Sequence, residues 1–287
     1  MSGPDPTFSE EDLLMRTERQ TTPGIQASAV SPDAEEERIG RRDGDYIIDH
    51  SFCEQTNMDV IKIQIISDIN CPWCYVGSNN LKSILMRFPQ RYHFDIEWKA
   101  YMCNPNLPFE GVDKVEYLKI RRGKDTADAY IKTLNRSGPR SGIRFNWNGV
   151  ISNSLTAHRL LDYSRAFGVQ DELAGRIFFE CWEREKNIAD VGTLGDISAT
   201  IGLDRDEVVK YLNSDEGRDK IFQEDQHART LGLSGVPTFF IGERKAENVE
   251  ELGDILEKMI YGGHPEDTTS SSTSTSSQMC SMDGTCS

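Results

Sequence analysis

The chain has 287 residues, 37% of them hydrophobic, and a formal net charge of −15 at pH 7. Its length allows one large domain or two small ones, and its acidic balance excludes a protein that binds nucleic acid through a broad basic surface. No apolar run is long enough to span a membrane, so we expect neither nucleic acid nor a membrane among its partners.

The first 58 residues contain 13 acidic and 5 basic residues and few apolar ones. Such a segment buries too little apolar surface to offset the entropy of the chain, so residues 1–58 are predicted to be a disordered acidic extension. They have neither the apolar stretch of a secretory signal nor the acid-poor composition of a transit peptide. We therefore expect a cytoplasmic protein, whose seven cysteines serve catalysis, metal binding or simple burial instead of a disulfide framework.

The first part of the folded region alternates between strand and helix signals. An Ile-rich run at 59–67 predicts a strand, and a Cys-Pro-Trp-Cys motif at 71–74 follows it closely. Apolar residues at helical spacing then predict a helix that ends near 88–89. Alternating apolar and polar residues predict a second strand over 93–101.

The middle of the chain, from about 111 to 231, is predicted to be mainly helical. Asn153, Asp190 and Asp204 each precede a run with helical periodicity. Because the side chains of Asn and Asp accept hydrogen bonds from the first N–H groups of a helix, these three residues are predicted to be N-caps.

The last part of the folded region returns to strand and helix. Residues 238–241 predict a short apolar strand, and residues 247–261 predict an amphipathic helix. Strand-crossover-strand units on either side of a helical block indicate an α/β sheet. Residues 262–287 form a Ser/Thr-rich tail that is predicted to be flexible.

The Cys-Pro-Trp-Cys motif stands where a strand leads into a helix. The start of a helix presents unpaired N–H groups and a partial positive charge, and both favour a thiolate at Cys71. The spacing places Cys74 one turn further on the same face, within reach of a disulfide. Cys71 is therefore predicted to be the exposed attacking sulfur, and Cys74 the more buried sulfur that resolves the mixed disulfide.

Two other features bear on this interpretation. Zinc needs four ligands, usually from a second cysteine pair, and the folded region has no such pair, so we expect no metal. Pro237 precedes the strand at 238–241, where a cis-proline with a specific role and an ordinary loop proline are equally consistent with the sequence. Its presence together with the cysteine motif favours the cis-proline.

With both elements present, the sequence resembles the DsbA-like thioredoxin family and, within it, the FrnE-like branch. The resemblance covers roughly residues 59–261 and is most specific at its two ends. The matching stretches are Ser67-Asp68 with Cys-Pro-Trp-Cys-Tyr at 71–75, Trp98-Lys99 with Asn104-Pro105, Asn153-Ser154-Leu155 with Ala157-His158-Arg159-Leu160-Leu161, and Ser214-Asp215-Glu216-Gly217 through Leu233-Ser234-Gly235-Val236-Pro237-Thr238-Phe239.

The resemblance implies an α/β thioredoxin fold with a helical domain, about residues 111–231, inserted between its βαβ and ββα halves. It implies Cys71 as the nucleophile, Cys74 as the resolving cysteine and Pro237 as the cis-proline beside the disulfide. The backbone of Val236 would then pair with an extended substrate as an added strand.

One short stretch departs from the family pattern. Ala100, Met102 and Cys103 stand where such proteins often carry Pro, Gln and Leu. The residues around the substrate groove are therefore expected to differ from those of the family, and the sequence assigns Cys103 no role.

Several residues have weaker claims to a function. Asp68 suits proton transfer during exchange or a turn-capping role, and the second is favoured. His158 suits the active-site cleft or, more commonly, a core or surface position. Trp73 is expected to tune the cysteine pair and to offer substrates an apolar contact. Cys280 and Cys286 suit a mobile dithiol that shuttles electrons to the pair, but incidental thiols on a flexible tail are the favoured interpretation.

Three classes of function follow. The leading one is an enzyme that exchanges disulfides with thiol- or disulfide-bearing proteins or peptides, with no cofactor and with glutathione as an optional co-substrate. The second is a glutathione-dependent isomerase or kappa-type transferase, which resembles this fold but places a serine at the position of Cys71. The third is a redox-sensing adaptor. The direction of electron flow depends on the reduction potential, which the motif does not fix.

Overall fold

The computed structural model describes residues 59–262. The predictions for residues 1–58 and for the tail that carries Cys280 and Cys286 lie outside the described residues. In chain order the elements are β1 (Asp59–Ser67), α2 (Pro72–Leu85), β2 (Tyr92–Ala100), β3 (Val112–Asp113), α3 (Lys114–Arg122), α4 (Lys124–Ser137), the 3₁₀ helix η3 (Gly138–Ser141), β4 (Val150–Ile151), α5 (Leu155–Arg165), α6 (Gln170–Trp182), α7 (Val191–Ala199), α8 (Arg205–Asn213), α9 (Arg218–Thr230), β5 (Thr238–Ile241), β6 (Arg244–Ala246) and α10 (Val249–Tyr261).

Within residues 59–262, one mixed sheet has the strand order β2-β1-β5-β6. β1 and β2 are parallel, with α2 as the crossover between them, whereas β5 is antiparallel to both β1 and β6. β1 is central, and its residues Ile63, Ile65 and Ile66 are at most 4% exposed. A run of buried β-branched residues is typical of a strand that is covered on both faces. The strands predicted at 59–67 and 238–241 are confirmed.

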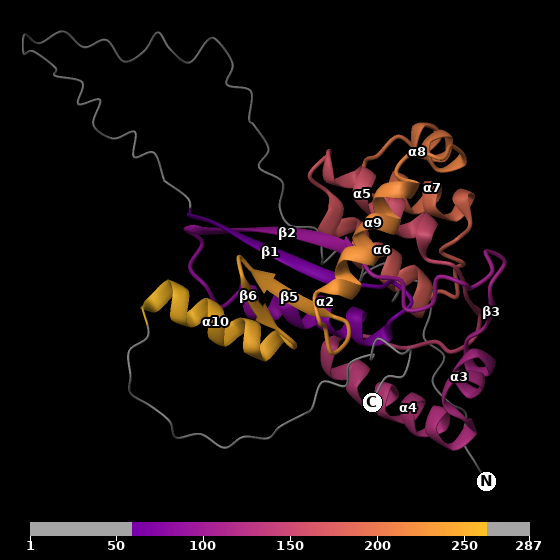
Figure 1. Ribbon diagram of the computed structural model, residues 1–287, viewed down its shortest axis with the longest axis horizontal. Helices are drawn as coiled ribbons and strands as arrows, with labels where there is room; N and C mark the ends of the chain where they lie inside the picture. Colours follow the sequence, from indigo (N-terminus) through magenta and orange to yellow (C-terminus); the bar gives the residue numbers. More distant parts are fainter. Residues whose placement is uncertain (1–58, 263–287) are drawn as a thin grey trace, which may run out of the picture. The chain divides into compact units, whose positions relative to one another are not determined.

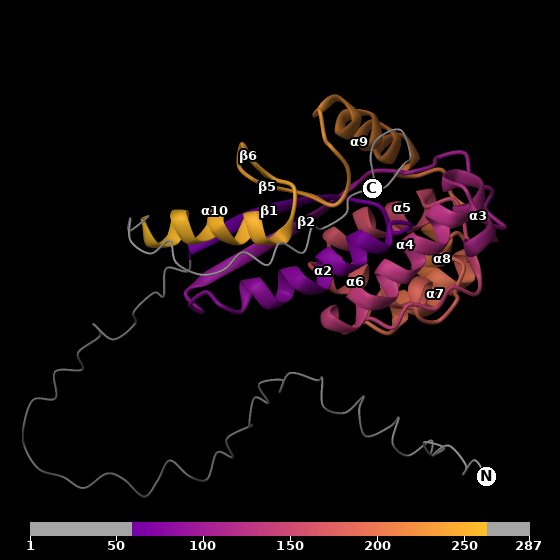
Figure 2. The same ribbon diagram turned by 90° about the horizontal axis from the view of Figure 1, so that it is seen from below.

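The helical insertion lies between β2 and β5 and contains α3 to α9, with the short antiparallel pair β3–β4. Figure 1 shows α5 to α9 gathered at the end of the sheet where β1 leads into α2. Figure 2 shows α9 and α2 on opposite sides of the strands. This arrangement confirms the predicted fold class, in which a helical domain is inserted between a βαβ half and a ββα half of a thioredoxin fold.

The predicted helix starts are correct at two of three positions. Asp190 and Asp204 cap α7 and α8, and their carboxylates accept the N–H groups of Thr193 and Glu207. At the third position Ser154, one residue later, occupies the cap of α5 but makes no side-chain capping hydrogen bond. The side-chain oxygen of Asn153 instead accepts the N–H of Leu155, the first residue of the helix, at 3.0 Å. The side-chain amide of Asn153 donates to carbonyl groups of the loop after β2, at 2.8 and 3.1 Å, so Asn153 supports the helix start and also fastens that loop.

The insertion is fastened to the turn that follows β1. The indole Nε1–H of Trp182, the last residue of α6, donates to the carbonyl of Ile69 at 2.9 Å. The side-chain amide of Asn70 donates to the carbonyl of Ser152 at 2.7 Å. Buried hydrogen bonds of this kind are expensive to leave unmade, so the insertion fixes the turn immediately before Cys71.

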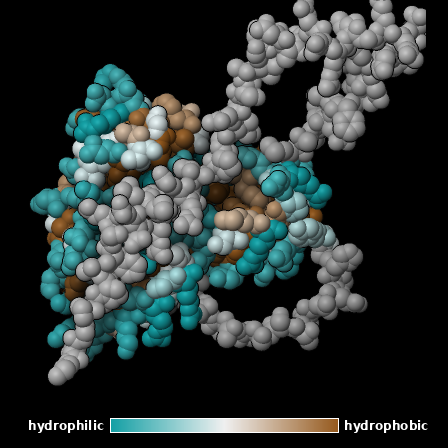
Figure 3. Space-filling model, turned by 180° about the vertical axis from the view of Figure 1, so that it is seen from behind, coloured by the Kyte–Doolittle hydropathy of each residue, from teal (hydrophilic) through white to brown (hydrophobic). Residues whose placement is uncertain are grey.

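The apolar stripe of α6 faces the core. Leu173, Ile177 and Phe178 are fully buried, whereas hydrophilic residues make up much of the surface seen in Figure 3, with apolar residues in separate patches. Among residues 59–262, no helix is both long and apolar enough to cross a membrane.

Candidate active site

Cys71 is the N-cap residue of α2, with φ −95° and ψ 111°, and Pro72 begins the helix. Proline suits this position because the N–H that it lacks has no partner inside the helix. The N–H of Cys74 donates to the carbonyl of Cys71 at 3.0 Å, so Cys74 follows one turn later. The pair therefore stands at the positive end of the helix dipole, which stabilises negative charge.

Both sulfur atoms are buried, with Cys71 1% and Cys74 0% exposed. The prediction that the sulfur of Cys71 is exposed is therefore wrong for this structure. The reason is long-range packing, since the loop before β5 reaches the start of α2. The thiol of Cys71 donates to the carbonyl of Val236 at 3.6 Å, and the side chain of Cys103 also hydrogen-bonds to Cys71.

The two cysteines differ in acidity. Burial alone would raise the pKa of Cys71, but hydrogen bonds from the Cys103 and Cys74 thiols and from the Cys74 N–H lower it well below the usual range. Burial raises the pKa of Cys74, and the neighbouring Cys71 raises it further. Since the thiolate is the nucleophile, Cys71 is the sulfur that can attack and Cys74 is the one that stays protonated.

The loop that carries Val236 and Pro237 lies against α2. Its Val236–Pro237 peptide bond is cis, as the family resemblance implies. Gly77, on α2, permits a close approach, because a Cβ at this position would lie 2.9 Å from Cγ of Pro237. The two residues predicted to meet substrate are both buried, with Trp73 6% and Val236 0% exposed, and Trp73 lies beside Pro237.

Gly77→Ala is expected to push the loop of Pro237 away from Cys71. Such overpacking should cost about 1–3 kcal/mol in the free energy of unfolding and lower the exchange rate several-fold. Gly253→Ala on α10 is the matched control, because a Cβ there would meet Ile84 at an ordinary 3.5 Å. Urea unfolding and an insulin-reduction assay would check both variants. Equal stability and activity in the two would show that the contact between α2 and the loop is unimportant.

Asp68 is 0% exposed. Its carboxylate contacts the turn before Cys71, the loop after β2 and the helix α5. Its Oδ1 accepts the N–H of Asn70 at 3.1 Å, and its Oδ2 accepts the N–H of Cys103 at 2.7 Å. Nε2 of His158, on α5, lies 3.5 Å from the same carboxylate. The turn-capping role favoured by the sequence is therefore present, while His158, expected in the core or at the surface, is buried against the site.

The pKa of Asp68 predicts a pH-dependent stability. Burial alone would raise this pKa, but the hydrogen bond and charge of His158 and the N–H groups of Cys103 and Asn70 lower it overall. A lowered folded-state pKa stabilises the fold fully above the unfolded-state value of about 3.9, and the contribution is lost as pH falls through the folded-state value. The free energy of urea unfolding should therefore decrease below about pH 4, and it should decrease less steeply in Asp68→Asn. Parallel curves for the two proteins would contradict this origin of the pH dependence.

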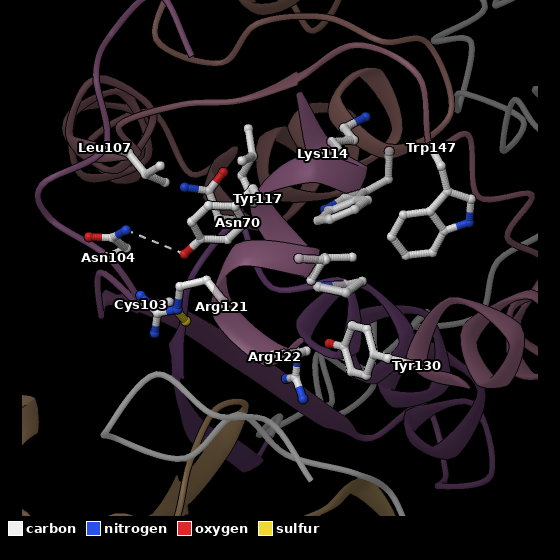
Figure 4. Close-up of a pocket in the computed structure, with 14 residues that line it drawn as sticks. Asn70, Cys103, Asn104, Leu107, Lys114, Tyr117, Arg121, Arg122, Tyr130 and Trp147 are labelled. Atoms are coloured by element: carbon white, nitrogen blue, oxygen red, sulfur yellow. Dashed lines mark hydrogen bonds between the residues drawn. The ribbon is translucent and has the colours of Figure 1, made fainter. Parts of the chain in front are cut away.

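Cys103 is the site residue that sequence reasoning missed. It follows β2 in a loop, and the only signal for it was the departure from the family pattern at Ala100, Met102 and Cys103. Together with Asn70 and Pro72 it lines a pocket beside the cysteine pair, which Figure 4 shows with Tyr117, Arg121 and Tyr130 around it. The pocket is mainly aromatic and aliphatic, with basic side chains from α3.

The arrangement can perform dithiol chemistry, because it combines an acidic thiol, a second thiol one turn away and a buried carboxylate. Among residues 59–262, no group of three or more His, Cys, Asp or Glu side chains is placed to hold a metal ion. Cys181, whose pKa burial raises to about 11, lies in the core.

Comparison with known proteins agrees with this geometry. The model of the DSBA-like thioredoxin domain family matches residues 62–271. A solved structure of a probable DsbA oxidoreductase from Streptomyces coelicolor is 22% identical and covers 79% of this chain and 98% of its own, with a TM-score of 0.64. A 2-hydroxychromene-2-carboxylate isomerase is 18% identical, covers 69% of this chain and 94% of its own, and has a TM-score of 0.54.

A third similar structure is the cytosolic disulfide reductase DsbM from Pseudomonas aeruginosa, solved with GSH. It is 15% identical and covers 70% of this chain and 100% of its own, with a TM-score of 0.50. At these identities, the three structures establish a shared fold.

Proposed function

The chain belongs to the DSBA-like thioredoxin domain family, and from this premise we propose that it is a thiol–disulfide oxidoreductase that acts on protein or peptide substrates through Cys71 and Cys74. The observation that carries the proposal is the difference in acidity between the thiols of Cys71 and Cys74. The pKa of Cys71, at the start of α2, is lowered well below its usual range by its hydrogen-bond donors, although burial opposes this, and the pKa of Cys74 is raised by burial.

The proposed reaction has two exchange steps. The thiolate of Cys71 attacks a substrate disulfide, forms a mixed disulfide and releases one substrate thiolate. Cys74 then loses its proton and attacks the sulfur of Cys71, which forms the Cys71–Cys74 disulfide and releases the second substrate thiolate. Asp68, whose buried carboxylate is close enough to Cys71 to raise its pKa, is proposed to take up the proton of Cys74. The reverse sequence would oxidise a substrate dithiol.

Substrate is proposed to enter along the loop before β5. The carbonyl of Val236 accepts the Cys71 thiol in the absence of substrate, and this contact is released when Cys71 ionises, because a carbonyl oxygen repels a thiolate. An extended peptide that pairs with the backbone of Val236 as an added strand would then place its disulfide beside Cys71. Trp73 would offer the peptide an apolar contact.

Glutathione is proposed as the small-molecule thiol that exchanges with the pair. The pocket beside Pro72 carries the guanidinium of Arg121 at its wall, which suits a ligand with carboxylates. The similar reductase DsbM was solved with GSH. A glutathione-dependent isomerase or transferase of the kappa type is the alternative function, and the thiol at position 71 disfavours it because that class has a serine there.

We also propose a branch of the family, domain boundaries and a cellular location for the chain. Membership in the FrnE-like branch is supported by the motifs of residues 59–261, which we propose as the catalytic domain, between an acidic extension at 1–58 and a Ser/Thr-rich tail at 262–287. A cytoplasmic location is proposed because a reducing compartment would return the pair to its dithiol form. Fractionation of cells that express the full chain would test this location.

The reduction potential of the Cys71–Cys74 couple in glutathione buffers tests the proposed function, with insulin reduction as the companion assay. We expect a reversible two-electron couple that is lost when Cys71 is replaced by serine. A value near about −270 mV would make the protein a reductase, and one near about −120 mV an oxidant. A pair that stays reduced throughout the buffer range and does not reduce insulin would refute the function.

A further inference from the structure

Three cysteine sulfur atoms of the described region meet at the start of α2. Cys103 reaches it because the chain after β2 continues alongside the end of β1. The N–H of Tyr101 donates to the carbonyl of Ser67 at 3.0 Å, and the N–H of Cys103 donates to Asp68 at 2.7 Å. These backbone contacts fix the segment next to the turn, and the Cys103 side chain hydrogen-bonds to Cys71.

Cys103 and Cys74 both interact with Cys71, but they differ in how deeply they are buried. Cys74 is completely buried beneath the helix start, whereas Cys103 is only partly buried and lines the pocket beside Pro72 (Figure 4). Cys103, unlike Cys74, therefore borders an open space beside the start of α2.

The pKa values of both thiols are raised. The pKa of Cys103 is raised by its hydrogen bond with Cys71 and by burial, and that of Cys74 by burial and then by Cys71. Once Cys71 carries a substrate sulfur, it no longer bears a negative charge, so this influence disappears for both thiols. Both thiols then ionise more readily than they do beside the Cys71 thiolate.

We propose that Cys103 is a second resolving thiol, which can attack the mixed disulfide at Cys71 in place of Cys74. The inference rests on the proposed function, because it needs the mixed disulfide that Cys71 forms. In this step the Cys103 thiol gives up its proton to solvent and its sulfur bonds to the sulfur of Cys71. The bond between Cys71 and the substrate sulfur breaks, and the substrate thiolate leaves. The protein is oxidised to a Cys71–Cys103 disulfide and the substrate is reduced.

The test uses the full-length chain with Cys53, Cys280 and Cys286 replaced by serine, so that only the cysteines of the described region remain. In this background Cys74→Ser is treated with one equivalent of Ellman's reagent per protein. Attack by Cys71 consumes the reagent and releases one thionitrobenzoate, so a second release requires another thiol of the protein to resolve the mixed disulfide. We expect the second release to be about tenfold or more faster in Cys74→Ser than in Cys74→Ser/Cys103→Ser, since a thiol tethered in the site has an effective concentration in the millimolar range.

Peptide mass spectrometry should then find Cys71 linked to Cys103. Cys74→Ser/Cys181→Ala is the matched control, because it removes a core thiol, and it should behave as Cys74→Ser does. Cys103→Ala replaces Cys103→Ser if the serine variant has an altered circular dichroism spectrum. A mixed disulfide equally long-lived with and without Cys103 would overturn the inference while leaving the proposed function intact. Failure of Cys71 to release even the first thionitrobenzoate would overturn both.

Discussion

Replacing Cys71 by serine is expected to lower the rate of disulfide exchange by about a thousandfold or more, the scale on which loss of a covalent nucleophile lowers turnover. A hydroxyl at this position does not ionise near neutral pH, so neither the helix start nor the hydrogen bonds from Cys103 and Cys74 can convert it into a nucleophile. Insulin reduction would measure the loss. The same variant distinguishes the alternative function, because a kappa-type glutathione enzyme uses a serine there and would keep or gain activity towards glutathione conjugation.

Cys181→Ala is the control for this experiment. Cys181 lies in the core on α6 and takes no part in the site, so its removal should lower the stability by about 1 kcal/mol and leave the exchange rate unchanged. Exchange that persists in Cys71→Ser would instead assign the attacking sulfur to another cysteine, and the proposed function of the Cys71–Cys74 pair would have to be abandoned.

The features that the sequence predicted well depend on neighbours within a few residues. The helix starts at Asp190 and Asp204 depend on a side chain and an N–H three positions later. The strand over Asp59–Ser67 and the pair at the start of α2 likewise follow from local composition and spacing. The residue pattern did not predict β6, which only the ββα half of the family resemblance implied, because three residues, two of them basic, carry no strand pattern of their own. The strand forms because β5 offers a backbone to pair with.

The features that were missed or wrong depend on contacts between distant residues. The burial of Cys71 arises from the loop of Val236, which lies 165 residues away in the sequence. Cys103 reaches the pair through Asp68, 35 residues earlier, and His158 comes from the middle of the helical insertion. Periodicity and motif spacing contain no information on such contacts, so the sequence could identify the reacting pair but not the side chains that set its acidity.

Asp68→Asn is expected to make Cys71 more acidic and to slow the attack by Cys74. Burial is the main influence that raises the pKa of Cys71, and the charge of Asp68 raises it further. A neutral side chain of the same size removes that repulsion, so the pKa of Cys71 should fall, which the ultraviolet absorbance of the thiolate would measure against pH. Resolution by Cys74 should slow by about a hundredfold, the scale expected for the loss of a general base. Rapid-mixing measurements of the release of the second substrate thiol, made in a Cys103→Ser background so that Cys103 cannot attack in place of Cys74, would report this rate.

Asp225→Asn is the matched control for a purely structural effect. Asp225 is also a buried carboxylate, and it accepts the N–H of Met102, the residue before Cys103, at 2.7 Å. Its partner is Arg229 on the same helix, not a cysteine. Each variant removes a buried charged partner and should lose stability, but only Asp68→Asn should lower the pKa of Cys71 and slow resolution. If both variants slowed resolution equally, Asp68 would act by positioning the segment that carries Cys103, and its proposed role in proton transfer would be lost.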